Sequence, residues 1–287
     1  MRASEGRDAP ETREPTGEAR SAPAPGAERF EVVRHGPGGA RRETIDVIAE
    51  VSCALYVNRF ELVSFMCSPV ELERLAVGFL LNEGVIGGAG EVAALRVRRG
   101  EGERLFIDVE LEREDVELPR RRILTSGCTG GVTFEDIAAR VERPIESPLS
   151  VTAEQVSATM TRLLEAARLY KETRGVHTSA LATPERLLVV CEDVGRHNTL
   201  DKIRGACALE GIDPAGGIVA STGRISSEML SKAAKMRCPV VMSRTSPTAL
   251  SVRLARRWGL TVIGYVRREG FNVYAGLERV VRAGAAP

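Results

Sequence analysis

The chain has 287 residues, of which 43 % are hydrophobic, and its formal net charge is +1. This length is enough for one large domain or two modest ones with a buried core, and the composition excludes a chain that is disordered throughout. The near-neutral charge provides no overall field for nucleic acid or a membrane surface, so neither is expected as a partner.

The first segment, residues 1–28, is rich in Pro, Glu, Arg, Ala and Gly and has no apolar pattern, which predicts a disordered tail. It also lacks the apolar core of a signal peptide. No later run of about 18 apolar residues could span a membrane. We therefore expect a cytoplasmic protein.

Two strands are predicted at the start of the next segment. The runs 45–51 and 60–66 are rich in β-branched and aromatic residues. Between them, Asn58 and Arg59 are candidates for a hairpin turn. These runs open an α+β unit that we expect to cover residues 29–150.

A helix is predicted after the second strand. Ser68, Pro69 and Glu71 have the pattern of a capping box, and helical apolar spacing continues to about Glu83. The alternating pattern of residues 104–111 predicts a further strand.

The last segment, residues 151–287, has the pattern of an α/β domain. A second capping box, Thr152 to Gln155, predicts a long helix that ends near Lys171. After it, short apolar runs alternate with helical stretches, which predicts a largely parallel sheet covered on both faces. Ligands bind at the carboxyl ends of the strands in such sheets. The apolar runs are 187–191, 217–221, 239–243 and 261–265, and the helical stretches are about 198–210, 225–236 and 247–258.

Polar turns follow the four apolar runs, and each turn contains arginine. A backbone N–H group at a helix N-terminus favours an anion, and an arginine side chain suits phosphate. A single turn of this kind is more often an ordinary capped helix start, but four together favour a pocket for a phosphorylated ligand such as a nucleotide. The arginines are Arg196, Arg224, Arg244, Arg267 and Arg268.

Two histidines near these turns are candidate site residues. His177 follows the long helix and His197 lies in the first polar turn. Histidine serves as a general acid or base or as a ligand, although a structural role is equally compatible with the position of His177.

Cys128 is the best candidate for a reactive thiol. The six cysteines form no CxxC pair, so a disulfide framework is not expected. Cys128 lies in the glycine-rich segment 125–131, which predicts an exposed, mobile loop, and the arginines at 120–122 favour its thiolate. A zinc site formed by Cys128, His177, Cys191 and His197 is the alternative, but these residues lack the spacing of known zinc sites, and no metal is predicted. The other five cysteines are expected to be buried packing residues: Cys53, Cys67, Cys191, Cys207 and Cys238.

Long motifs of this chain resemble the FdhD family, the formate dehydrogenase accessory sulfurtransferases. The resemblance covers roughly residues 40–276. The motifs that carry it are 68–84, 175–177, 192–202, 223–229, 243–248, 264–267 and 272–274.

The resemblance implies a sulfur carrier. Members of the family accept sulfur from a cysteine desulfurase as a persulfide and pass it to the molybdenum cofactor, bis-molybdopterin guanine dinucleotide, before the cofactor enters formate dehydrogenase. Cys128 matches the persulfide-carrying cysteine. The cofactor-binding stretch, where a guanine nucleotide is also expected to bind, matches Tyr265, Val266, Arg267, Arg268, Glu269 and Gly270, and His177, His197 and Arg224 are further candidates.

The resemblance also implies a cytidine deaminase-like fold for the C-terminal domain and a homodimer. The deaminase signature itself is absent, because Thr178 and Ser179 follow His177. Many members carry CxxC in the cysteine loop, whereas Gly131 occupies the second position here. A cofactor-binding chaperone that does not transfer sulfur, and a metal-dependent hydrolase that uses His177 and Cys128, are the alternative functions.

Overall fold

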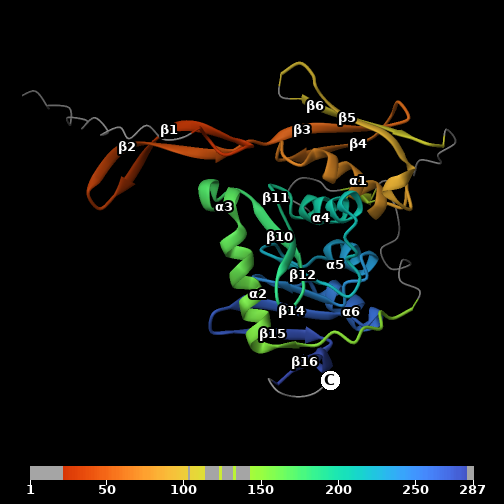
Figure 1. Ribbon diagram of the computed structural model, residues 1–287. Coiled ribbons are helices and arrows are strands. Elements are labelled where there is room, and N and C mark those ends of the chain that lie inside the picture. Colours follow the sequence, from red (N-terminus) through yellow and green to blue (C-terminus); the bar gives the residue numbers. More distant parts are fainter. Residues whose placement is uncertain (1–21, 103, 114–122, 125–131, 134–142, 283–287) are drawn as a thin grey trace, which may run out of the picture.

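Two main sheets form the molecule in the computed structural model, which describes residues 22–102, 104–113, 123–124, 132–133 and 143–282 (Figure 1). The four-stranded sheet has the order β4-β3-β6-β5, and the six-stranded sheet has the order β11-β10-β12-β13-β14-β15. Helices α1 and α4 lie between the two sheets.

The smaller sheet packs its apolar face against α1. Its hairpin turn is the predicted one, because Asn58 (φ 45°) and Arg59 (φ 73°) both adopt the left-handed conformation that tight hairpins require. The predicted strand 45–51 is confirmed for residues 45–48, which lie in β2, but it is not continuous, since β2 ends at Ile48 and a new strand begins at Val51 in a different sheet. The predicted strand 104–111 is confirmed. The elements are β3 (Val51–Val57), β4 (Phe60–Cys67), α1 (Leu72–Asn82), β5 (Val92–Arg99) and β6 (Arg104–Leu111).

The predicted capping box at the start of α1 is wrong. The residue before the helix, Glu71, has a left-handed backbone (φ 54°), and no side chain caps the helix start. The Ser68 hydroxyl instead accepts a hydrogen bond from the amide of Val194, 3.1 Å away. The Ser68 hydroxyl therefore makes a tertiary hydrogen bond in place of the helix-capping bond that the local sequence pattern predicts. The helix ends at Asn82, next to the predicted end.

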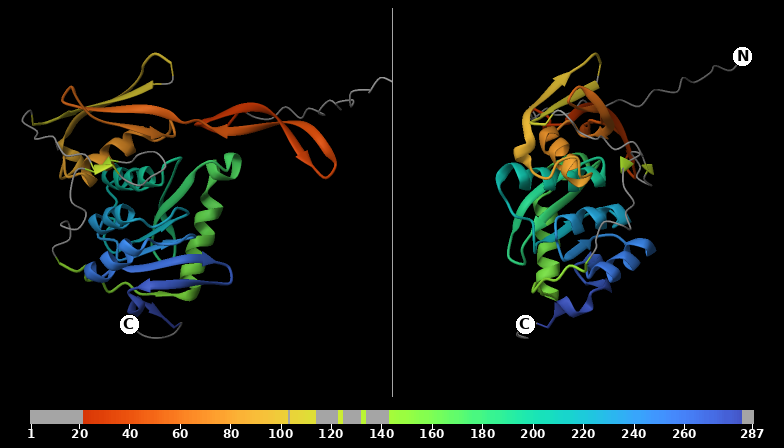
Figure 2. Two further views of the ribbon diagram at one scale, coloured as in Figure 1. Left: turned by 180° about the vertical axis from the view of Figure 1, so that it is seen from behind. Right: turned by 90° about the vertical axis from the view of Figure 1, so that its right-hand side faces the viewer.

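A two-stranded arm extends away from the body of the molecule (Figure 2). It consists of β1 (Ala27–Gly36) and β2 (Gly39–Ile48). Charged residues along β1 conceal its strand pattern, so this strand was not predicted. Ala27 and Glu28 belong to β1 and not to the predicted tail.

The six-stranded sheet is mixed. The pairs β12–β13 and β13–β14 are parallel, whereas β10 pairs antiparallel with both β11 and β12, and β14 pairs antiparallel with β15. The four predicted strands, β11 to β14, run in one direction as expected, and the two strands that were not predicted, β10 and β15, run in the opposite direction and make the sheet mixed. The strands are β10 (His177–Ala182), β11 (Leu187–Asp193), β12 (Ile218–Ser221), β13 (Val240–Ser243), β14 (Thr261–Arg267) and β15 (Gly270–Ala275).

Helices cover both faces of this sheet, as predicted. Alternate residues of β12 show why its sequence is continuously apolar: Val219 faces α4–α6, while Ile218 and Ala220 face α2. The helices are α2 (Ala153–Ala166), α4 (Arg196–Glu210), α5 (Ser227–Lys235) and α6 (Ala249–Trp258). No helix in the described part of the chain has the length and apolar character needed to cross a membrane.

The long helix predicted after residue 152 is interrupted. Its capping box is confirmed, since Thr152 and Gln155 exchange side-chain hydrogen bonds with each other's backbone amides. The chain leaves the helix at Ala167, and a short second helix follows, α3 (Arg168–Thr173). The Glu192 carboxylate accepts hydrogen bonds from the amides of Leu169 and Tyr170 in the first turn of α3, which stabilises the start of this second helix.

Six short elements complete the described fold. A strand pair, β9 with β16, brings the start of α2 to the C-terminal end of the described chain. These elements are η1 (Ala89–Glu91), β9 (Val151–Thr152), η3 (Leu277–Arg279), β16 (Val280–Val281) and the strand pair β7 (Ile123–Leu124) with β8 (Val132–Thr133).

Helices α1 and α4 cross at backbone contact. A Cβ atom on Gly78 would lie 1.7 Å from the carbonyl oxygen of Asp201, and one on Gly205 would lie 1.9 Å from that of Arg74. Glycine is therefore required at both positions. This crossing joins the two sheets, and the domain boundary expected near residue 150 stays a prediction.

Candidate functional site

The predicted polar turns lie along one edge of the six-stranded sheet. The parallel strands β12, β13 and β14 end there, and β10, which runs in the opposite direction, begins there with His177. Strand β11 also ends at this edge, and the chain then continues into α4. The topology thus brings together residues that are up to 93 positions apart, from His177 to Gly270.

Backbone hydrogen bonds connect neighbouring turns. The amide of Thr222 donates to the carbonyl of Thr178 (2.9 Å), and the amide of Arg244 donates to that of Ser221 (3.1 Å). Further along, the amide of Tyr265 donates to the carbonyl of Thr245 (3.0 Å). The turns at this edge of the sheet therefore form one continuous surface and not a set of independent loops. We call this surface the polar edge.

Buried hydroxyl groups fix the part of the edge between β10 and α4. The Ser179 hydroxyl lies 2.7 Å from that of Thr199 and donates to that of Ser221 (2.9 Å). The Thr199 hydroxyl donates to the carbonyl of Arg196 (2.7 Å), and the Ser221 hydroxyl accepts from the amide of Gly223 (3.0 Å). These bonds hold the Arg196 and Gly223 backbones in one arrangement.

His177 and Arg196 meet at the Gly223 turn. A Cβ atom on Gly223 would lie 2.9 Å from the Arg196 Cβ atom and 3.3 Å from His177 Nδ1, so the glycine allows all three to approach. Burial, followed by the positive charge of Arg196, lowers the pKa of His177. His177 is therefore neutral at physiological pH, and a neutral imidazole can donate one hydrogen bond and accept another.

His197 is engaged through both ring nitrogens. Its Nε2 lies 3.1 Å from the Ser226 hydroxyl, and its Nδ1 lies 3.2 Å from the carboxylate of Glu228. Although this carboxylate favours protonation, burial and the surrounding cations outweigh it and hold the pKa of His197 well below its usual value. His197 thus orders the start of α5 and offers no nitrogen to a ligand in this arrangement.

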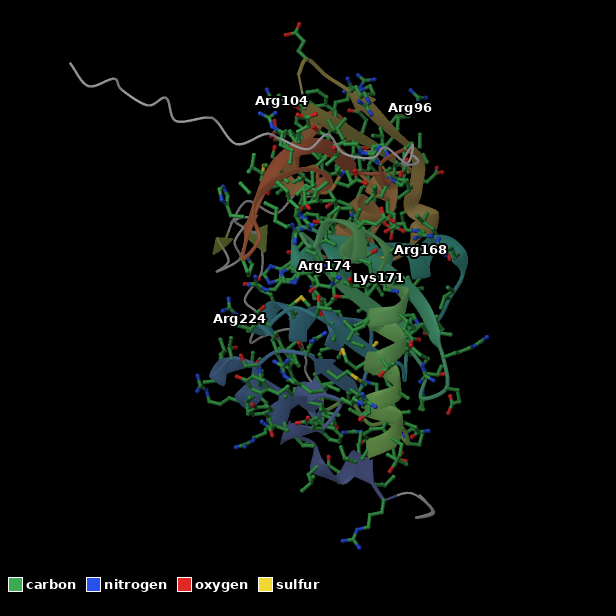
Figure 3. All side chains as sticks on the ribbon, turned by 90° about the vertical axis from the view of Figure 1, so that its left-hand side faces the viewer. Arg96, Arg104, Arg168, Lys171, Arg174 and Arg224 are labelled. Atoms are coloured by element: carbon green, nitrogen blue, oxygen red, sulfur yellow. The ribbon has the colours of Figure 1, made fainter. Side chains whose placement is uncertain are left out.

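Arg224 differs from Arg196 in exposure. Its side chain is exposed, and Figure 3 shows it on the side of the molecule away from α2 and from the cations on and just after α3. Arg196 is only 6 % exposed. The two arginines therefore supply one outer and one inner positive charge to the same turn region.

The segment 265–270 forms the hairpin between β14 and β15. Tyr265 has a left-handed backbone (φ 54°) and lies at a register shift of β14, where two residues face one residue of β15. Its side chain is 43 % exposed. Such a bulge re-aims a side chain, which here places an aromatic ring at the surface beside the exposed Arg267 and Arg268.

The motif 192–202 has a structural role that its sequence does not reveal. Asp193 and Lys202 form a buried ion pair of 2.6 Å, and Asp193 also accepts hydrogen bonds from the amide of Ser68 and the side chain of Asn198. The two residues are nine positions apart along the chain, a spacing that gives no sign of the pair, because one partner is in a strand and the other in a helix.

Cys128 lies outside the described residues. The short strands β7 and β8, on either side of residues 125–131, pair antiparallel. The five described cysteines are buried, as predicted. Burial raises the pKa of the thiols of Cys191 and Cys238, and that of Cys207 to about 11, so these three are protonated at neutral pH.

The described residues contain no group of three or more His, Cys, Asp and Glu side chains that could hold a metal ion. Cys191 lies in β11 and is 1 % exposed, whereas His197 is bonded to Ser226 and Glu228 in the start of α5. The zinc ligand set considered from the sequence, which also includes Cys128, is therefore not assembled by the described part of the chain.

The chain is similar to curated sulfur carriers. It is 34 % identical over 255 residues to the sulfur carrier protein FdhD of Staphylococcus aureus strain MRSA252. The matched region covers 87 % of this chain and 95 % of that protein. The protein of the same name from strain Newman matches with the same identity and coverage.

A solved structure has the same fold. The crystal structure of a putative formate dehydrogenase accessory protein from Desulfotalea psychrophila matches with a TM-score of 0.70 and 28 % sequence identity, over 90 % of this chain and 100 % of that chain. The FdhD/NarQ family matches residues 48–281, which include both main sheets and the whole polar edge. The chain therefore belongs to the FdhD/NarQ family.

Proposed function

We propose that this protein is a sulfur carrier for formate dehydrogenase and acts as a sulfurtransferase in the cytoplasm. In this proposal, Cys128 receives sulfur from a cysteine desulfurase and delivers it to bis-molybdopterin guanine dinucleotide before that cofactor enters formate dehydrogenase. The similarity to proteins named sulfur carrier protein FdhD and formate dehydrogenase accessory protein supports the carrier role.

The first chemical step is thiol exchange. The Cys128 thiolate attacks the outer sulfur of the donor persulfide, an S–S bond forms at Cys128, and the donor cysteine leaves as a thiolate. No external oxidant or reductant is needed for this step, because one S–S bond replaces another.

Release of the outer sulfur at the oxidation level of sulfide requires two electrons. A second thiol can supply them by forming a disulfide with Cys128. Gly131 occupies the position where many relatives have that second loop cysteine. A thiol of a partner protein or of a second copy in the proposed homodimer is therefore the expected reductant.

The polar edge is the proposed site for the cofactor. The guanine dinucleotide arms carry phosphate groups and planar bases, and the edge offers exposed Arg224, Arg267 and Arg268 together with the exposed ring of Tyr265. These residue types fit such a ligand, because guanidinium groups bind phosphate and aromatic rings stack on bases. The cofactor supplies the metal that accepts sulfur, while the chain binds and orients it.

One observation carries this proposal: five strand ends converge on a single arginine-containing edge. That convergence supports ligand binding by the described residues and does not depend on Cys128. The expected likeness of this domain to cytidine deaminase is also a proposal, and it requires no deaminase chemistry.

The experiment that tests sulfur transfer is mass spectrometry of the intact protein after incubation with cysteine and a cysteine desulfurase. The wild type and the control variant Cys207→Ala are expected to gain sulfur, whereas Cys128→Ala is not. If Cys128→Ala gains sulfur equally, Cys128 is not the carrier. If no variant gains sulfur but guanine nucleotide still binds, the cofactor-binding chaperone is the better description.

A further inference from the structure

Arg196 is a buried cation whose hydrogen-bonding groups lack partners. It is the first residue of α4 and is 6 % exposed. Its Nε and Nη2 atoms are shielded from solvent and have no hydrogen-bond partner among the described residues. Buried polar groups in folded proteins are nearly always paired, and a buried charge without a partner is strongly unfavourable.

The two unpartnered atoms form one edge of the guanidinium group. The N–H bonds of Nε and Nη2 point in the same direction, and this fork matches two oxygens of a single oxyanion. Two other arginines with an unpartnered Nε, Arg162 and Arg279, each donate through an Nη atom to a backbone carbonyl. Within the described ranges, only Arg196 leaves both atoms of its fork without a partner.

The surroundings of Arg196 favour negative charge. It lies at the N-terminus of a 15-residue helix that has no acidic residue in its first turn. The nearby carboxylate of Asp193 is already paired with Lys202 and bonded to the amide of Gly195. His177, in contact with the same turn, adds a neutral ring that can donate a further hydrogen bond.

The Arg196 side chain is held in place before any ligand binds. The side chain is 6 % exposed, and a Cβ atom on Gly223 would lie 2.9 Å from the Arg196 Cβ atom and 3.3 Å from its Cδ atom, so the Gly223 turn packs closely against it. The Thr199 hydroxyl also donates to the Arg196 carbonyl. A fork fixed in this way loses little conformational entropy on binding. The fork, the neutral imidazole ring and the N-terminus of α4 together offer more donors than the two oxygens of a carboxylate can use, which suits a phosphate group better.

We propose that the Nε–Nη2 fork of Arg196 binds one phosphate group of an anionic ligand beside His177 and the N-terminus of α4. This site rests on the proposed function only for the identity of the ligand, since a nucleotide cofactor carries such groups. Gly223 and Tyr265 belong to the β12 and β14 ends, two strand spacings or roughly 10 Å apart. One ligand can therefore contact both the fork and the exposed ring.

The test is calorimetric titration of the full-length protein with inorganic phosphate, GDP and guanosine. Arg196→Gln is expected to weaken the binding of phosphate and of GDP by about tenfold or more, since it removes charge-assisted bonds. The affinity for guanosine is expected to stay the same. The matched control is Arg204→Gln, because Arg204 is a half-buried arginine on the same helix with an unpartnered Nε. It is expected to bind all three ligands like the wild type.

Thermal unfolding separates a binding role from a structural one. A purely structural Arg196 would make Arg196→Met less stable in phosphate-free buffer. A ligand-binding Arg196 predicts that this variant is at least as stable as the wild type, because an unpaired buried charge is removed, and that phosphate no longer raises its Tm. A lower Tm together with unchanged phosphate affinity overturns the proposal.

The ligands also distinguish the source of the phosphate group. Binding of GDP at much lower concentration than inorganic phosphate supports a nucleotide, and equal affinities support a free phosphate ion at the same fork. Failure of the wild type to bind either one overturns the site. Persulfide loading of the wild type is measured separately, and its failure contradicts sulfur transfer without affecting the titrations.

Discussion

The ammonium group of Lys202 lies 2.6 Å from the carboxylate of Asp193, and neither side chain has any exposed surface. The same carboxylate accepts hydrogen bonds from the amides of Ser68 and Gly195. One buried charge pair therefore connects the end of β11, the start of α4 and the segment before α1. The pair therefore stabilises the junction between the two sheets. The polar edge begins at this junction.

Breaking this pair is expected to be costly. Lys202→Met leaves the Asp193 charge buried without its partner, so the free energy of unfolding should fall by about 3–5 kcal/mol, measured by urea denaturation. The control Arg34→Met removes one partner of the Arg34–Glu43 pair on the exposed arm, where the arginine is 60 % exposed. It should cost less than about 1 kcal/mol. Equal effects in the two variants would contradict the structural role of Lys202.

The crossing of α1 and α4 predicts a strong penalty for any side chain at Gly78. In Gly78→Ala the new Cβ atom would meet the Asp201 carbonyl, so the helices must separate. We expect a loss of at least about 1–3 kcal/mol in the free energy of unfolding. Gly90→Ala is the control, because no atom lies within 4 Å of the position of its Cβ atom. A Gly78→Ala variant as stable as Gly90→Ala would show that the helices do not pack this closely.

The sequence predicted elements whose patterns arise from burial. Strands β12, β13 and β14 are buried on both faces and read as unbroken apolar runs, and α4–α6 lie close to their predicted ranges. The Asn58-Arg59 turn was also predictable, because its conformation depends on only two residues. The edge position of the polar turns followed from the alternation of strands and helices.

Features that depend on distant contacts were not predictable. Ser68 has the local chemistry of a helix cap, but a partner more than a hundred residues away takes its hydroxyl. The β1–β2 arm pairs charged residues across strands, such as Arg29 with Asp46, and therefore lacks a core-facing pattern. Arg196 was predicted as one of five arginines in the polar turns, and no sequence signal distinguishes its buried fork from the exposed Arg224.

Tyr265 is expected to combine backbone strain with ligand contact. A left-handed backbone costs a residue with a Cβ atom about 1–2 kcal/mol, and replacement by glycine adds about 0.5–1 kcal/mol of unfolded-state entropy. Tyr265→Gly should therefore leave the free energy of unfolding unchanged or raise it by up to about 1.5 kcal/mol. Urea denaturation measures this change.

The same variant tests whether the ring contacts a base. Stacking on a base contributes about 1–3 kcal/mol, so Tyr265→Gly should weaken GDP binding by about fivefold to a hundredfold in calorimetry. Tyr265→Phe retains the ring and should bind like the wild type. Lower stability with normal GDP affinity in Tyr265→Gly would mean that the ring serves packing and not recognition.

His197 is expected to make the fold sensitive to acid. Its pKa is held well below 6.5 by burial and by nearby cations, with Lys232 the largest of these. Below about pH 6.5 the unfolded chain binds a proton that the folded protein does not, so the free energy of unfolding falls by up to about 1.4 kcal/mol per pH unit. In His197→Asn this part of the dependence of the free energy of unfolding on pH should disappear. The loss of the Ser226 and Glu228 contacts lowers the stability of this variant at every pH, but it does not change that dependence.

Urea denaturation from pH 7.5 to 5 measures the two slopes. Burial raises the pKa of Asp201 and makes an opposite contribution, but this residue is present in both proteins and cancels in their difference. Identical slopes for His197→Asn and the wild type would mean that His197 is protonated in the folded protein, with the Glu228 carboxylate rather than the cations controlling its charge.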